Sequence, residues 1–251
     1  MSLQEDVTLR SPQSKNIVYL EYDHSNLPPS SPGYTRFVCI SDTHTRRFPV
    51  PDGDVLLHSG DLTNTGTLQE FERTMTWIYE LPHKNRERIL ELLKGKKAQE
   101  ANVVYLQDES HFFQAKEGGR LWSVYGSPYF IRLTHGPPRD IFDRTNSGDL
   151  PGCPTLAAAL PHLRPRLHLF GHIHEAHGAH VHSWSKGNVG SVQNSAQTQA
   201  DEPMVEDDED DDDVTVFVNA ANWPMGQRKL EYQTKAFGRP GFRPVVVDML
   251  E

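Results

Sequence analysis

The chain of 251 residues contains only two cysteines, Cys39 and Cys153. Two cysteines cannot form the disulfide framework of a small secreted domain, and they fit a reducing compartment. No apolar run approaches the roughly 20 residues of a membrane-spanning helix, and residues 1–16 show no apolar core of a signal peptide. These absences predict an intracellular, cytoplasmic protein that is not embedded in a membrane.

The chain also lacks an excess of positive charge. Its 25 Lys and Arg face 34 Asp and Glu, a net charge of −9, and the run Glu206–Asp213 alone supplies −8 of it. The remainder is nearly neutral, so we expect no groove for nucleic acid and no chain-wide basic surface. The composition of residues 183–213 predicts a disordered acidic insertion. Its acidic run is expected to be a solvated loop, with contact to a basic partner as the alternative.

Apolar, β-rich runs alternate with helical patterns from about Tyr34 onward, which is typical of an α/β domain. Residues 1–33 are expected to be a flexible N-terminal segment with one short strand at 17–22, and residues 34–251 to form the domain. A helix is predicted at 67–81, where Thr67 and Glu70 form a capping box. Further helices are predicted at 86–93 and 155–163, and strands at 36–40, 55–58, 103–106, 121–125, 131–133, 166–170, 214–218 and 245–249.

Four of these predicted strands end directly in side chains that can bind metal. Because the carboxyl ends of parallel strands meet at one edge of a sheet, these side chains are expected to converge. The set contains two carboxylates and four imidazoles: Asp42, His44, Asp61, His135, His172 and His174. Oxygen and nitrogen ligands without thiolate suit Mn, Fe or Zn better than Mg.

Six ligands exceed the needs of one tetrahedral ion and fit a pair of ions about 3.5–4 Å apart. Asp61 is the natural bridge, because a carboxylate has two oxygens and Gly60 lets the backbone turn tightly beside it. His58 is a candidate for orienting a ligand from behind, with an ordinary strand residue as the alternative. His177, His180 and His182 are expected to be loop residues.

At these residues the chain resembles the calcineurin-like metallophosphoesterase superfamily, in its branch of metallophosphoesterase domain-containing proteins. The resemblance rests on these stretches: 36–44 (RFVCISDTH), 54–61 (DVLLHSGD), 105–110 (YLQDES), 125–128 (YGSP), 134–138 (THGPP), 152–154 (GCP), 165–175 (PRLHLFGHIHE) and 217–221 (FVNAA). It implies two mixed β-sheets packed as a sandwich with flanking helices. It also implies that Asp42, His44, Asp61 and His174 hold one ion, while Asp61, His135 and His172 hold the other.

One element of that family is missing. Between Gly60-Asp61 and His135 the family has an apolar strand that ends in Gly-Asn-His, whose Asn binds metal and whose His lies beside the leaving group. Here residues 81–88 read LPHKNRER, with no apolar run and no Gly-Asn-His. We therefore expect one inner strand to be deleted, and no catalytic acid can be assigned.

The resulting hypothesis is a metal-dependent phosphoesterase of reduced activity that acts on a small phosphoester or nucleotide. The resemblance implies hydrolysis of a phosphodiester by a hydroxide that bridges the metals. The alternatives are a homologue that binds metal or nucleotide without turnover, and a truncated isoform.

Overall fold

The computed structural model describes residues 7–10, 15–23, 27–83, 85–87, 103–104, 106, 109–124, 130–185, 187–193, 213–222 and 243–251. These residues form two seven-stranded mixed sheets. The first has the order β1-β2-β14-β3-β4-β5-β6, with β1 (Val7–Arg10), β2 (Asn16–Glu21), β14 (Val245–Leu250), β3 (Tyr34–Ile40), β4 (Val55–His58), β5 (Asn85–Glu87) and β6 (Val103–Val104).

The second sheet has the order β12-β11-β13-β10-β9-β8-β7. Its strands are β12 (Gly187–Gln193), β11 (Gly178–Ser183), β13 (Val214–Asn219), β10 (Leu167–Phe170), β9 (Phe130–Leu133), β8 (Leu121–Val124) and β7 (His111–Gln114). In each sheet four adjacent strands run parallel and antiparallel strands flank them: β3 to β6 in the first, and β13, β10, β9 and β8 in the second. This architecture confirms the predicted sandwich of two mixed sheets.

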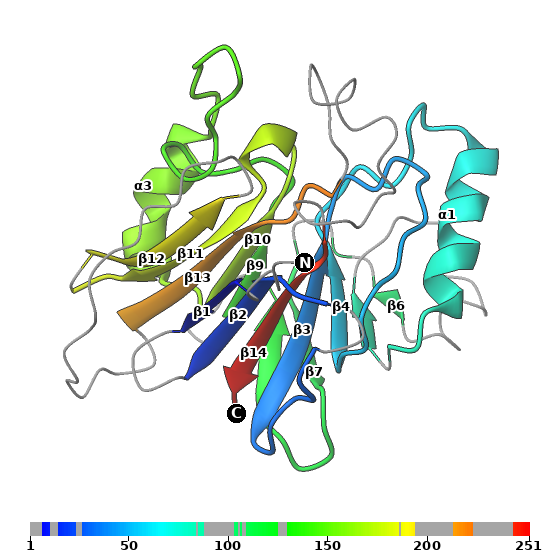
Figure 1. Cartoon of the computed structure of the whole chain (residues 1–251), viewed down its shortest axis with the longest axis horizontal. Coiled ribbons are helices and arrows are strands. Elements are labelled where there is room, and N and C mark those ends of the chain that lie inside the picture. The colour runs from blue at the N-terminus through cyan, green and yellow to red at the C-terminus, as the bar shows by residue number, and fades with distance from the viewer. Residues whose placement is uncertain are drawn as a thin grey trace, which may run out of the picture.

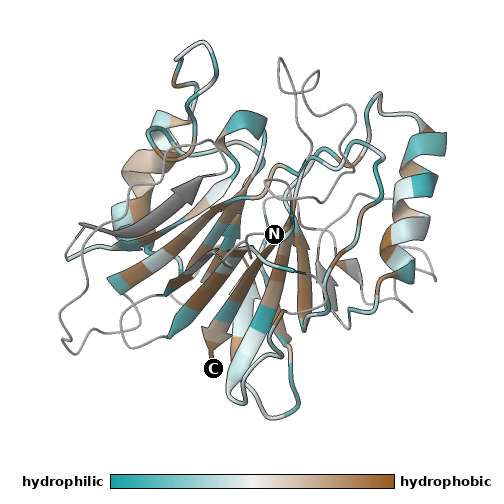
Figure 2. Ribbon diagram, in the orientation of Figure 1, coloured by the Kyte–Doolittle hydropathy of each residue, from teal (hydrophilic) through white to brown (hydrophobic). Residues whose placement is uncertain are grey.

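Alternating residues of both sheets build the central core. Phe37 and Cys39 on β3 face the same cluster as Leu167 and Leu169 on β10, because side chains two apart on a strand share a face. The apolar strands of both sheets are visible as brown arrows in Figure 2. Burial also raises the pKa of the Cys39 thiol, as expected for a cysteine that serves in packing.

A helix covers the outer face of each sheet (Figure 1). Helix α1 (Leu68–Glu80) begins where the Thr67 hydroxyl accepts the Glu70 N–H, as the predicted capping box requires. Its Met75 and Ile78 pack on the outer face of the first sheet. Helix α3 (Pro154–Leu163) packs on the second sheet through Leu160, and the short 3-10 helix η3 (His174–Ala176) follows β10.

The N-terminal residues differ from the expected flexible segment. The predicted strand at 17–22 is present as β2, but Val7–Arg10 also forms a strand, β1, which pairs with it. Strand β2 in turn pairs with β14 near the other end of the chain. Its Val18 and Leu20 belong to the central core, so the ordered part of the sheet begins well before Tyr34.

The interpretation of residues 183–213 as disordered is wrong for β12. This strand pairs in antiparallel fashion with β11 and has a register shift at Val181/His182. Strand β11 also contains His180 and His182, which had been predicted to be loop residues. Polar composition concealed both strands, because β11 can satisfy the backbone of β12 without an apolar pattern. Residues 194–212 lie outside the described part.

The expectations for residues 85–93 also need correction. Residues 85–87 form β5, a strand that pairs in parallel with β4 and with β6, where a helix from 86 had been predicted. Residues 88–93 lie outside the described part. The first sheet therefore has no gap beside β4, because the short polar segment after α1 supplies the backbone partners that an interrupted sheet would lack.

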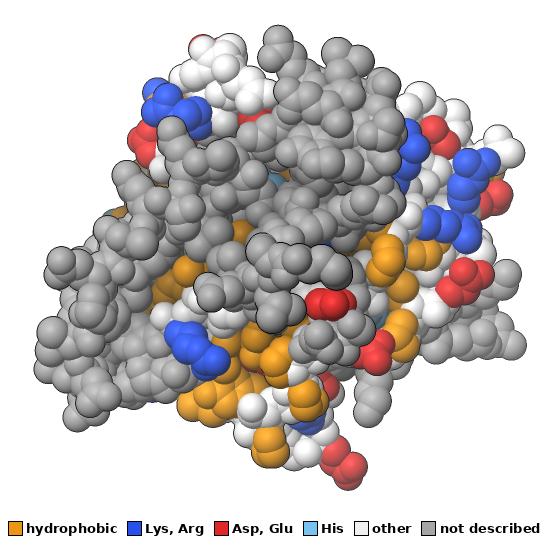
Figure 3. Space-filling model, viewed as in Figure 1, with side chains coloured by type: hydrophobic (Ala, Val, Ile, Leu, Met, Phe, Trp, Pro, Cys, Tyr) orange, Lys and Arg blue, Asp and Glu red, His pale blue; other side chains and the backbone are white. Residues whose placement is uncertain are grey.

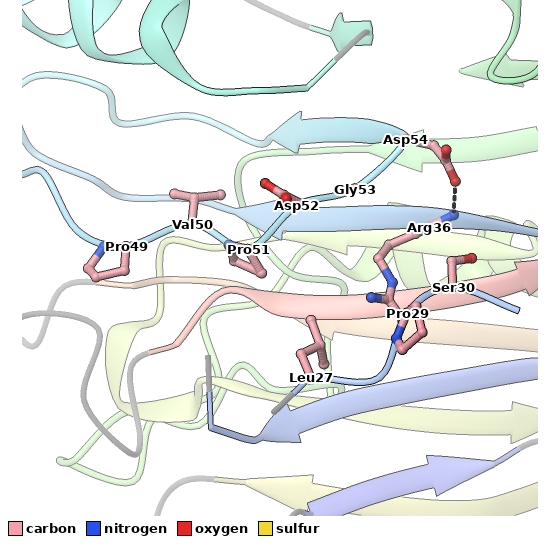
Figure 4. Close-up of a pocket in the computed structure, with 10 residues that line it drawn as sticks. All are labelled: Leu27, Pro29, Ser30, Arg36, Pro49, Val50, Pro51, Asp52, Gly53 and Asp54. Atoms are coloured by element: carbon pink, nitrogen blue, oxygen red, sulfur yellow. Dashed lines mark hydrogen bonds between the residues drawn. The ribbon is translucent and has the colours of Figure 1, made fainter. Parts of the chain in front are cut away.

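Among the described residues on the face in Figure 3, Lys and Arg side chains are interspersed with Asp and Glu. A cavity of about 700 Å³ is lined by Pro29, Arg36, Pro51 and Asp54, among others (Figure 4). It lies near the amino ends of β3 and β4, away from the edge where the candidate ligands follow the strands. Among the described residues, no helix is long and apolar enough to cross a membrane.

Buried histidines predict an acid-sensitive fold. Desolvation lowers the pKa of His168 to about 3 and that of His177 to about 4. An unfolded chain, with histidine pKa values near 6.5, therefore binds more protons between pH 6.5 and 4, and stability falls as the pH falls through this range. For His168 alone the loss from pH 6.5 to 5 is about 2 kcal/mol. Urea unfolding in EDTA at both pH values should show a smaller loss for His168→Gln than for the wild type.

The matched control is His162→Gln, at an exposed position on α3. It should keep the wild-type dependence on pH. Equal pH dependence in His168→Gln and the wild type would contradict this account of acid sensitivity.

Candidate metal centre

The turns after β3 and β4 continue side by side beyond the ends of the strands. The N–H of Asp42 donates to the carbonyl of Gly60 at 2.9 Å, and the N–H of His44 donates to the carbonyl of Asp61 at 3.0 Å. In the second sheet the N–H of Gly171 donates to the carbonyl of His135 at 2.9 Å. Backbone hydrogen bonds thus place all the candidate ligands of each sheet on neighbouring turns.

These turns hold an unusual backbone conformation. Four of the six candidate ligands have positive φ angles: Asp42 (53°), His44 (44°), Asp61 (52°) and His172 (68°). Residues other than glycine adopt this region rarely, and it costs about 1–3 kcal/mol at each position. Neighbouring residues must hold the turns in this conformation.

Asp42 joins the two sheets. Its carboxylate is fully buried and accepts the backbone N–H of His172 at 3.0–3.1 Å, while Nε2 of His174 lies 3.2 Å from Oδ1. Burial by itself raises the pKa of Asp42, but the interactions with His174, Ser41 and the His172 N–H lower it to about 2. The carboxylate is therefore an anion held between a turn of each sheet.

Asp61 lies between two histidines. Its Oδ2 is 3.8 Å from Nε2 of His44, and its Oδ1 is 3.5 Å from Nε2 of His135. The ligand atoms of Asp42, His44 and His174 lie within 4.8 Å of one another, and so do those of Asp42, Asp61 and His135. Asp42 is thus common to both groups, whereas the sequence pattern predicted Asp61 as the shared residue. The two oxygens of Asp61 nevertheless face opposite halves of the site.

A backbone carbonyl orients the ring of His44. Its Nδ1 lies 3.1 Å from the carbonyl oxygen of Thr63, which can only accept, so Nδ1 carries the proton of a neutral ring. Nε2 is then the ring nitrogen that is available to a metal ion. It is buried without a hydrogen-bond partner among the described residues, and its ring stacks on His174 with centroids 5.3 Å apart.

The remaining candidates lie on the open side. His172 belongs to neither close group, but its ring lies edge-on to that of His135 with centroids 5.0 Å apart. The side chains of Asp61 and His135 are 45% and 34% exposed, against 0% for Asp42 and 7% for His174. The site therefore has a buried half and an accessible half.

Two glycines permit these close approaches. A Cβ on Gly60 would lie 2.6 Å from Nδ1 of His135, and the φ of +134° at Gly60 already disfavours other residues. A Cβ on Gly171 would lie 2.0 Å from Oδ2 of Asp42. Steric crowding therefore explains why glycine occupies these positions of the Gly-Asp and Gly-His-x-His motifs.

Two asparagines that the site prediction missed fasten the turns. Oδ1 of Asn222 accepts the backbone N–H of Ser41, and the backbone N–H of Asn222 donates to the carbonyl of Ser41. Nδ2 of Asn219 donates to the carbonyl of Ile173, between His172 and His174. The only sequence signal for these roles was the stretch 217–221, which contains Asn219 but not Asn222.

His58 contacts residues next to the candidate ligands. Its Nδ1 accepts the N–H of Gly60 at 3.2 Å, and its Nε2 lies 3.2 Å from the hydroxyl of Thr43. The three other histidines predicted to be loop residues lie on a different part of the second sheet. His180 and His182 lie on β11 near Phe217, and His177 is buried just before that strand.

Carboxylates and imidazoles gathered at one edge of two sheets are the donor set of a site for divalent metal ions. Nε2 of His44 and the carboxylate of Asp61, 3.8 Å apart, both have the chemistry of ligands for such an ion. No thiolate lies in either close group. The residues present therefore fit the cofactor that the motifs imply.

Comparison with known proteins finds several relatives of the chain. No model of a known protein family matches the chain. The chain is 30% identical over 210 residues to human Metallophosphoesterase domain-containing protein 1, covering 60% of this chain and 64% of that protein. It is 33% identical over 193 residues to Probable rhamnogalacturonate lyase C of Emericella nidulans, covering 59% of this chain and 18% of that protein. The chain thus spans less than two thirds of the length of these two relatives.

A third relative is covered more fully. UPF0046 protein C25E10.12 of Caenorhabditis elegans is 32% identical over 197 residues, covering 57% of this chain and 70% of that protein. The chain belongs to the UPF0046 family of metallophosphoesterase domain-containing proteins.

Proposed function

We propose that the chain is a phosphoesterase that uses two divalent or transition ions, of Mn, Fe or Zn, to hydrolyse a small phosphoester or nucleotide substrate at a phosphodiester bond. The observation that carries the proposal is the buried Nε2 of His44, which lies 3.8 Å from an oxygen of Asp61 and has no hydrogen-bond partner among the described residues. A divalent ion bound between these atoms would take both of them as ligands. The carbonyl of Thr63 behind His44 orients the ring, as the partners of metal-bound histidines usually do.

The roles of the residues follow from their positions. Asp42, His44 and His174 would hold one ion in the buried half, and His135 and His172 the other, with Asp61 offering one oxygen to each. Bound divalent ions polarise a phosphoryl oxygen and acidify a water molecule for attack on phosphorus. The chain itself binds the ions, orients their ligands and leaves the side of Asp61 and His135 open for a substrate.

A phosphodiester with a good leaving group suits this site best. Without Gly-Asn-His, the chain lacks the histidine expected beside the leaving oxygen, and such a general acid typically contributes about 10²–10⁴ in rate. Substrates whose leaving group needs no proton lose least from this absence. The activity is therefore expected to be low against phosphoesters with poor leaving groups.

The same absence favours a second candidate function, namely binding of metal and nucleotide without turnover. The two candidates differ in one measurable respect. Two bound ions together with hydrolysis support the enzyme, and bound metal with no hydrolysis supports the binding protein.

Replacement of the shared carboxylate tests the enzyme directly. Asp61→Asn keeps the shape of the side chain but removes the negative charge between His44 and His135. We expect at least one Mn ion to be lost and hydrolysis of bis(p-nitrophenyl) phosphate in Mn to fall by about 10²-fold or more. Metal content of the purified variant and initial rates measure the two effects.

The control is Asp52→Asn, the same change at an exposed position beside the cavity at the amino ends of the strands. It should keep the metal content and the rate of the wild type. Turnover by Asp61→Asn at the wild-type rate would refute the assignment of the site.

A steric change tests the buried half. In Gly171→Ala the new methyl group would overlap Oδ2 of Asp42 and Oγ of Ser41, 2.0 Å and 2.3 Å from the Cβ position. Displacement of the carboxylate should weaken Mn binding by about 10-fold or more, as loss of ligand orientation does. Calorimetric titration with Mn gives the affinity. Gly136→Ala is the control, since its Cβ would meet no atom within 4 Å, and equal affinities in the two variants would contradict the role of Gly171.

A further inference from the structure

We propose that two histidines outside the ligand set, His58 and His168, are positioning residues, each of which fixes one half of the metal centre through a threonine beside the ligands. His58 acts on Thr43, between Asp42 and His44. His168 acts on Thr134, which precedes His135. This inference rests on the proposed function, because it assigns these residues to the support of bound ions.

The first pair joins two ligand-bearing turns. The N–H of Gly60 donates to Nδ1 of His58, so the proton of a neutral ring lies on Nε2. Nε2–H then donates to the hydroxyl of Thr43 at 3.2 Å, and that hydroxyl has a longer contact of 3.5 Å to the carbonyl of Leu62. His58 thus connects the residue before Asp61 to the residue between Asp42 and His44. Both turns have the positive φ angles that need external support.

The second pair has the same chemistry in the other sheet. The hydroxyl of Thr134 donates to the carbonyl of Gly136 at 2.9 Å, which leaves its lone pairs to accept Nε2–H of His168 at 3.0 Å. His168 is fully buried on β10, and Nδ1 has no hydrogen-bond partner among the described residues. The Thr134 hydroxyl therefore bridges the turn around His135, and His168 holds that bridge from the neighbouring strand.

The two pairs occupy corresponding places. Each histidine lies on a strand that is the parallel neighbour of the strand leading to its threonine: β4 beside β3, and β10 beside β9. In each case the polar contact reaches the turn at the carboxyl end. The halves of the metal centre therefore have separate supports, and each support should be removable without the other.

This separation makes the test specific. Thr43→Val and Thr134→Val remove only the hydroxyl that each histidine contacts, whereas Thr43→Ser and Thr134→Ser retain it. Calorimetric titration of the full chain with MnCl₂ resolves the two ions, and His44→Ala and His135→Ala identify which ion each half holds. The unfolding temperature in EDTA reports whether a variant is folded without metal.

We expect Thr43→Val to weaken binding of the same ion as His44→Ala does, by about 10–100-fold. Thr134→Val should weaken binding of the same ion as His135→Ala does, by a similar factor. The other ion should stay within about twofold of the wild type, and the serine variants should restore the affinity. His58→Asn, whose oxygen can accept the Gly60 N–H but whose side chain is too short to reach Thr43, should resemble Thr43→Val.

Two results would overturn the inference while leaving the proposed function intact. In the first, the wild type binds two ions and the valine variants bind both ions with the same affinity. In the second, each valine variant binds both ions more weakly and also has a lower unfolding temperature in EDTA. A wild type that binds no Mn would overturn the proposed function, and the inference with it.

Discussion

The buried carboxylate of Asp42 is the interaction on which the site depends. It is removed from solvent and accepts the backbone N–H of His172 from the opposite sheet, while His174 lies against one of its oxygens. An unpaired anion in such a place would be costly, so the two sheets must meet here in one arrangement. Asn222 fixes the same junction through both hydrogen bonds to the backbone of Ser41. The sandwich thus brings residues 130 positions apart together at one edge.

The site has a buried half at this junction and an accessible half beside it. Asp42, His44 and His174 lie deep, whereas Asp61 and His135 lie toward solvent, so the second half of the site is the one that is open to solvent. The second half is also where the family's Gly-Asn-His would have contributed. Strand β5 keeps the sheet continuous. The absence of the motif therefore removes functional side chains at the end of a strand and leaves the sheet itself complete.

The sequence predicted those parts of the structure that depend on local patterns. Strands such as β3 and β10 are largely apolar because both of their faces are buried, and the Thr67 cap marks helix α1. Strands β1, β5 and β12 were missed because they are short or polar, and their pairing depends on distant partners that no local pattern reveals. The six candidate ligands could be named in advance from their places after apolar runs. Asn222 and His168 could not, since their contacts are with distant segments, at Ser41 and Thr134.

A crystal of the full chain soaked in MnCl₂, with anomalous scattering recorded at the Mn edge, tests the central claim most directly. The account predicts two peaks about 3.5–4 Å apart, one among Asp42, His44 and His174 and the other beside His135 and His172, with Asp61 between them. No anomalous peak within coordination distance of Asp61, in crystals that bind Mn elsewhere, would contradict it.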